Sequence, residues 1–193
     1  YASAFLTLNY ILPATVPAQD APPAEPAATQ PATAPAGATP IMAIVLEVRG
    51  TAQHKPLDGE EWQPCGEGDQ YPPKTVIRTG VRSSVKLQIG EDDTYTAVLI
   101  ESATKTVISA ALRTEDEKRV RIGVGYGRIR AGVAEGGLKS DFTVDSPVAT
   151  LSKRGTWNFG LYYERGTDRF QIFLLDQGLV EAFSRVTRER RQL

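Results

Sequence analysis

Histidine and cysteine are the side chains that most often act as bases, nucleophiles or soft metal ligands, and this 193-residue chain has one of each. A serine or cysteine nucleophile needs an imidazole base, and that role would fall to His54. His54 lies in the polar stretch Gln53-His54-Lys55, which is typical of an exposed strand end. Cys65 lies beside glycines without a second cysteine, which predicts an ordinary loop thiol rather than a zinc site or a redox pair. We therefore expect a protein that is not an enzyme, with no catalytic residue, no metal ligand and no cofactor.

Carboxylates and glycines offer two further kinds of site. Residues 91–93 and 115–117 are acidic turns that could bind calcium, but their spacing fits no EF-hand loop and solvated acidic turns are common. No pair of carboxylates stands out for glycoside cleavage. The glycine run at residues 123–127 imitates a nucleotide-binding loop, yet residues 128–132 do not form the good helix that this motif requires. These glycines instead predict a strand that twists and packs closely on its neighbours.

Aromatic residues are the candidates for a binding surface. The densest group is Trp157, Phe159, Tyr162 and Tyr163, and Trp62 lies far from it in the sequence. Strand alternation places Trp157 and Phe159 on one face. Two interpretations stay open for the group: the core of a β-sandwich, or an exposed platform for a sugar ring or a partner strand. The candidate binding residues are therefore Trp62, Trp157, Phe159, Tyr162 and Tyr163.

The elements that must position these residues are strands. Residues 141–159 read as two strands hinged at Ser146-Pro147, with Phe142 and Val144 alternating with polar neighbours. Roughly ten to twelve short strands follow one another at spacings of about 8–12 residues between residues 41 and 183, with turn residues between them. No stretch in this range has a sustained 3.6-residue apolar period. The pattern predicts an all-β fold: an antiparallel β-sandwich, jelly-roll-like or β-helix-like.

The two ends of the chain differ in composition from this region. Residues 1–12 are mostly apolar but too short to span a bilayer, which suggests the remnant of an export signal or, alternatively, a short strand that packs on a neighbour. Residues 13–40, the Ala/Pro spacer, hold eight of the 13 prolines and predict an extended, polyproline-like linker. Residues 184–193 are rich in arginine and predict a basic tail or a short helix end. We thus expect a folded domain at residues 41–183.

The overall charge bears on the class of partner. The formal net charge is −1 and the isoelectric point is about 6.0, which gives no electrostatic case for nucleic acid. Charged residues make up 23 % and hydrophobic residues 41 %, as in ordinary globular proteins.

Short motifs follow one another in a fixed order along the expected strands. They are Gly50, Trp62, Gly68-Asp69, residues 77–80, residues 83–87, residues 125–129, residues 142–149, Arg154-Gly155-Thr156 and Gly178-Leu179-Val180. This order resembles the FecR domain, an all-β module of exported bacterial proteins, and the resemblance covers about Val45 to Phe183. The best-known members of that family pass a signal from an outer-membrane receptor to an extracytoplasmic-function sigma factor. Those regulators carry an anti-sigma segment and a spanning helix before the β module, and residues 1–44 show neither pattern.

Together these features predict a binding or scaffolding module in the periplasm or at the cell surface of a bacterium. Its expected partner is a protein or a second copy of the chain, contacted through residues 1–40 and exposed edge strands. Alternatives are a carbohydrate- or wall-binding module with Trp62 or Trp157 as the stacking platform, and the sensor part of a sigma-factor regulatory system. A hydrolase using His54 is the third hypothesis. We expect no nucleic acid, and contact with a membrane only through an export signal.

Overall fold

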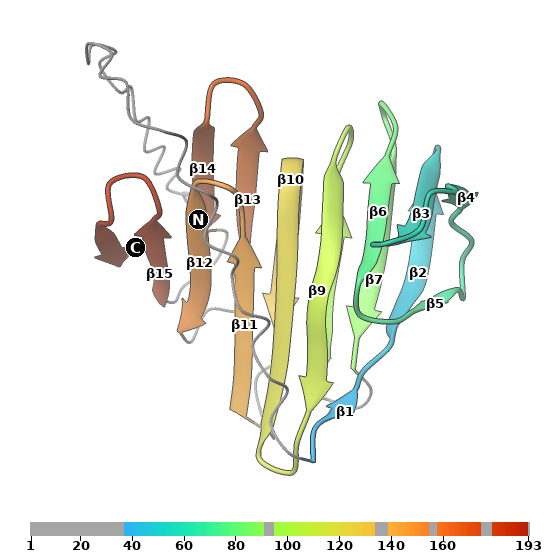
Figure 1. Cartoon of the computed structure of the whole chain (residues 1–193), viewed down its shortest axis with the longest axis horizontal. Helices are drawn as coiled ribbons and strands as arrows, with labels where there is room; N and C mark the ends of the chain where they lie inside the picture. The colour runs from blue at the N-terminus through green and yellow to red at the C-terminus, as the bar shows by residue number, and fades with distance from the viewer. Residues whose placement is uncertain (1–36, 91–94, 134–138, 155–157, 175–178, 193) are drawn as a thin grey trace, which may run out of the picture.

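The chain is built from strands alone in the part that the structure describes. The computed structural model describes residues 37–90, 95–133, 139–154, 158–174 and 179–192. These residues form sixteen strands and no helix, which confirms the all-β prediction (Figure 1). Across these ranges there is accordingly no helix long and apolar enough to cross a membrane.

The strands run from three to nine residues, apart from the two-residue β1, β4 and β5 and the 17-residue β10. In chain order they are β1 (Thr39–Pro40), β2 (Ala43–Arg49), β3 (Ala52–Pro56), β4 (Gln63–Pro64), β5 (Gln70–Tyr71), β6 (Thr75–Thr79), β7 (Ser84–Ile89), β8 (Thr96–Ile100), β9 (Lys105–Arg113), β10 (Glu117–Val133), β11 (Lys139–Asp145), β12 (Ala149–Arg154), β13 (Asn158–Glu164), β14 (Arg169–Leu174), β15 (Leu179–Ser184) and β16 (Arg190–Gln192).

The strands form two layers that share β10. The first layer, sheet A, has the order β4-β3-β6-β9-β10-β11-β12-β15-β16, and β1 pairs with the far end of β9. The second layer, sheet B, has the order β5-β2-β7-β8-β10-β13-β14. The first part of β10 pairs with β9 and β11, and its last part pairs with β8 and β13. Buried residues of both sheets form one core between the layers, as in a β-sandwich.

The core lies between the layers and follows the alternation that the sequence predicted. Phe142 and Val144 of β11 are fully buried, and so are Val85 and Ile89 of β7. The hinge at Ser146 is confirmed, because its hydroxyl accepts a hydrogen bond from the Ala149 amide at 3.0 Å where β11 turns into β12. Apolar side chains of this kind each contribute roughly 1.5–3 kcal/mol when they leave water.

The glycines of β10 serve close packing. Gly127 has a φ of +96°, which favours glycine, and a Cβ there would lie 2.6 Å from the Thr104 Cα. A side chain at this position would therefore overlap the backbone beside β9. The structure supports the packing interpretation of this run, since β10 continues through it as a strand, with a register shift between Val124 and Tyr126.

Two features depart from the expectations. One pairing among those described, β10 with β11, is parallel, while the sequence suggested an antiparallel sandwich. The basic tail is neither frayed nor helical at residues 190–192, because these form β16 beside β15. Arg190 stabilises that pairing through an ion pair with Glu181 at 3.3 Å. Residues 1–36, which include the apolar segment and most of the Ala/Pro spacer, lie outside the described residues.

Candidate binding surfaces

The aromatic group predicted from the sequence is divided between the core and the surface. Phe159 and Tyr163 are only 1 % and 3 % exposed, so they belong to the core and cannot act as a platform. The Tyr163 hydroxyl donates a hydrogen bond to Asp168 Oδ1 at 2.9 Å, and burial raises the pKa of this tyrosine. Trp157 lies outside the described residues. Of this group, Tyr162 alone is placed at the surface, half-buried on the outer face of sheet B.

Cations and apolar side chains form a continuous surface on the outer face of sheet B. The strand register aligns Lys86, Leu99, Arg130, Gly160 and Phe173 in one row across five neighbouring strands. The next row places Arg128 opposite Tyr162. We call this surface the cationic face, and it consists of Lys86, Leu99, Arg128, Arg130, Tyr162 and Phe173.

The charges of the cationic face are only partly neutralised. Arg130 Nε lies 2.6 Å from Glu101 Oε1, and Arg128 Nη1 lies 3.7 Å from Glu101 Oε2. Two guanidinium groups therefore share one carboxylate. The Arg128 Cζ also lies 5.4 Å from the Tyr162 ring centroid and 5.2 Å from that of Phe173, within the range of cation–π attraction.

Gly160 gives this face its shape. A Cβ at Gly160 would lie 3.1 Å from the Ile129 carbonyl oxygen and 3.2 Å from Arg130 Cγ, so a larger residue would push the arginine outward. Two shallow hollows flank the arginines. One, of about 540 Å³, is lined by Arg128, Tyr162 and neighbouring residues, and the other, of about 280 Å³, is lined by Lys86, Leu99 and neighbouring residues.

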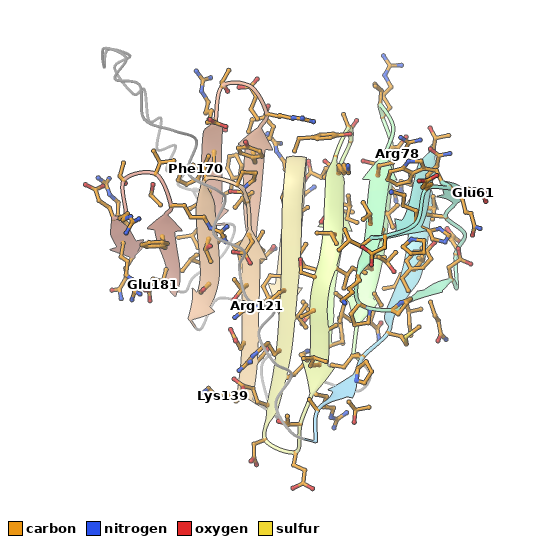
Figure 2. The ribbon with its side chains drawn as sticks, in the orientation of Figure 1. Glu61, Arg78, Arg121, Lys139, Phe170 and Glu181 are labelled. Carbon is orange, nitrogen blue, oxygen red and sulfur yellow. The ribbon has the colours of Figure 1, made fainter. Side chains whose placement is uncertain are left out.

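Trp62 lies on a different surface, the outer face of sheet A at the end formed by β3 and β6. The Arg78 Cζ lies 4.0 Å from its ring centroid, and Arg78 also donates two hydrogen bonds to Gln53 Oε1, at 2.9 and 2.7 Å. Figure 2 shows Arg78 at this end of the molecule and Phe170 at the opposite end. One face of the indole is thus already covered by a guanidinium group, which leaves less of the ring for a sugar.

His54 and Cys65, which the sequence left as separate residues, lie together. Their Nδ1 and Sγ atoms are 3.9 Å apart. The His54 ring stacks on Tyr71 with centroids 4.3 Å apart, and this contact joins β3 of sheet A to β5 of sheet B. Tyr71 donates to Asp69 Oδ2 at 2.8 Å. The structure corrects the expectation that His54 is an exposed strand end: His54 lies in the middle of β3 and is half-buried, because its ring packs on Tyr71.

The hairpin from β3 to β4 is what brings the two residues together. His54 is the register partner of Gln63, and the Cys65 amide donates to the Ala52 carbonyl oxygen at 3.0 Å. Recognising this pairing in the sequence would have placed Cys65 beside the His54 strand. A cleft of about 830 Å³ opens at this end and includes His54 in its lining.

The geometry around Cys65 does not favour nucleophilic catalysis. Burial raises the pKa of its thiol, which disfavours the reactive thiolate. The two nearest amides are already engaged, because that of Cys65 donates to Ala52 and that of Gly66 donates to Asp69 Oδ2 at 2.7 Å. Neither is free to stabilise an oxyanion. Within the described ranges, no group of three or more histidine, cysteine, aspartate or glutamate side chains could hold a metal ion.

The chain was compared with known protein families, curated proteins and solved structures. No family model, no curated protein and no solved structure matches the chain.

Proposed function

We propose that this chain is a non-enzymatic binding module of the bacterial envelope or surface that binds an acidic protein partner through the cationic face. The extracytoplasmic location rests on the resemblance to FecR domains and on the Ala/Pro spacer, which suits a tether. The location of the binding surface rests on one observation: three cations and three apolar side chains share this face, and its two arginines share the carboxylate of Glu101.

The composition of the face supports a protein partner. Arginine and aromatic residues are enriched in protein–protein interfaces and dominate their binding energy. The Arg128 and Arg130 side chains are 46 % and 48 % exposed, so both can contact a partner without a rearrangement of the sheet. A partner with carboxylates around an apolar residue would match both the charges and the apolar side chains of this face.

Site-specific cross-linking tests this proposal. A photo-reactive amino acid replaces Phe173 in the cationic face or, as a matched control, the exposed Ser109 on the outer face of sheet A. We expect one cross-linked product of defined mass from position 173 in the native cells. It should disappear with Arg130→Glu and weaken at high salt, because the contact depends on charge.

Three outcomes would change the assignment. Equal products from positions 109 and 173, or a product that survives Arg130→Glu, would contradict the proposed surface. A product with twice the mass of the chain would replace the separate partner by a second copy. Edge strands are the alternative route for such self-assembly, since β14 pairs only with β13 among the described strands.

A carbohydrate partner is the second candidate, favoured by Tyr162 in its hollow of about 540 Å³. Arg128, Glu101 and Glu164 also line this hollow, and planar polar groups beside an aromatic ring suit a sugar. Glycans binding to the wild type, but at least tenfold more weakly to Tyr162→Ala, would support this candidate. The absence of binding across a broad glycan panel would remove it. The sigma-factor sensor role is supported only by the resemblance, and a neighbouring sigma-factor gene would favour it.

A further inference from the structure

We propose that Cys65 Sγ and His54 Nδ1 together bind one soft monovalent cation, Cu(I) or its redox-inert analogue Ag(I), at the end of the sandwich. This inference is independent of the cationic face. Thiolates are the protein ligands that select Cu(I), and imidazole suits copper as well.

The distance between the two atoms fits a shared metal ion. Metal–sulfur and metal–nitrogen bonds of about 2.3 and 2.0 Å, as in zinc sites, would span about 4.3 Å if the three atoms were linear. The observed separation of 3.9 Å is bridged by the same bonds at an angle of about 130°. The two atoms are therefore close enough to share one two-coordinate cation.

The surrounding groups select against harder cations. The nearest carboxylate, that of Asp69, already accepts hydrogen bonds at Oδ2 from the Tyr71 hydroxyl and the Gly66 amide. Zinc sites take four ligands, and calcium takes six to eight oxygens. One sulfur and one nitrogen donor satisfy neither ion, whereas they suffice for a two-coordinate d¹⁰ cation.

Access and charge balance also support the site. His54 lines the cleft of about 830 Å³, so the imidazole side of the proposed site faces this cleft. Binding replaces the thiol proton of Cys65, which leaves to solvent, so the bound thiolate neutralises the single positive charge. Coordination through Nδ1 leaves the imidazole proton on Nε2, and stacking on Tyr71 fixes the ring in place.

The rarity of these residues strengthens the inference. The chain has one cysteine, one histidine and one methionine. The two strongest soft ligands of the protein are in contact.

An anaerobic titration of the full chain with Cu(I), in competition with bicinchoninate, tests the proposal. We expect one bound Cu(I) per chain. Cys65→Ser and His54→Gln should each weaken Cu(I) binding at least about tenfold. Even the loss of a residue that only supports a metal ligand typically lowers metal affinity by that factor. Met42→Leu removes the remaining soft side chain, which is 38 % exposed, and should bind as the wild type does.

A second measurement uses the wild type alone, so it does not depend on the folding of a variant. Ag(I) should shift the Nδ1 resonance of the sole histidine in a ¹⁵N spectrum, and X-ray absorption of the Cu(I) form should show one sulfur and one nitrogen donor. A shift at Nε2 instead, an absorption spectrum without sulfur, or Cu(I) affinity unchanged in Cys65→Ser would overturn the proposal.

Discussion

Phe142 of sheet A and Phe159 of sheet B meet edge to face across the core, with ring centroids 5.6 Å apart and planes inclined by 61°. Both are at most 1 % exposed. Edge-to-face pairs of this kind add about 0.5–1.5 kcal/mol to the burial of the two rings. The contact therefore joins the two layers where β11 and β13 face one another.

Phe142→Ala should lower the free energy of unfolding by about 3–5 kcal/mol, because it removes a buried ring and leaves a cavity between the sheets. Val81→Ala is the control, since Val81 is 79 % exposed and its truncation should change stability by no more than about 0.5 kcal/mol. Chemical denaturation of both variants measures the difference. Similar small losses for both would show that the two rings do not hold the layers together.

Gly127→Ala and Gly68→Ala separate steric overlap from backbone strain. Both glycines have positive φ, +96° and +85°, but a Cβ at Gly127 would overlap Thr104 while one at Gly68 meets nothing within 4 Å. Gly68→Ala should cost about 1–2 kcal/mol from the left-handed backbone alone. Gly127→Ala should cost more than that, because β9 and β10 must also move apart. Equal losses in thermal or denaturant unfolding would argue against close packing at Gly127.

The stability of the fold should fall at alkaline pH, partly because of Tyr163. Burial, with the hydrogen bond to Asp168, raises the pKa of Tyr163 above the ordinary value of 10.0. The unfolded chain then loses the phenolic proton at a lower pH than the native chain. This contribution is present in full below pH 10 and is lost as the pH rises through the folded pKa.

Tyr163→Phe tests this directly. The variant loses the hydrogen bond to Asp168 and should be about 1 kcal/mol less stable at pH 8. The gap between wild type and variant should narrow as unfolding is measured up to about pH 11, because only the wild type has this phenol to ionise. A gap that stays constant or widens would contradict the raised pKa.

Arg78→Ala should expose the covered face of Trp62. In a Trp157→Phe background, the emission maximum of Trp62 should shift to longer wavelength. Acrylamide should also quench the Trp62 fluorescence more strongly. The loss of stability should be small, about 0.5–1 kcal/mol, as for exposed cation–π pairs. Arg49→Ala, which removes an arginine that is 73 % exposed, is the control and should leave the fluorescence unchanged. Unchanged quenching in Arg78→Ala would show that the guanidinium does not shield the ring.

Local patterns were sufficient to predict much of this fold. Alternation with polar neighbours identified Phe142 and Val144 as apolar positions of one strand face, and both are fully buried. The turn at Ser146-Pro147 was predicted because proline cannot donate to a ladder, and β12 begins just beyond it. Alternation could not say whether Phe159 faces the core or a ligand, because both interpretations place apolar residues on one side of a strand.

Relationships between distant strands could not be read from such patterns. The parallel pairing of β10 with β11 and the row from Lys86 to Phe173 depend on strand order, which no short motif specifies. The contact between His54 and Cys65 depends on a hairpin whose β4 has two residues and no apolar alternation. The pairing of β16 could not be predicted either, because its residues are all exposed and have no apolar alternation.

The membership of β10 in both layers has a consequence for how the molecule opens. Sheet A pairs with the first part of this 17-residue strand and sheet B with its last part, so one continuous strand belongs to both sheets. We therefore expect the two layers to unfold together. In that case the central amides of both layers should exchange with deuterium only through global unfolding.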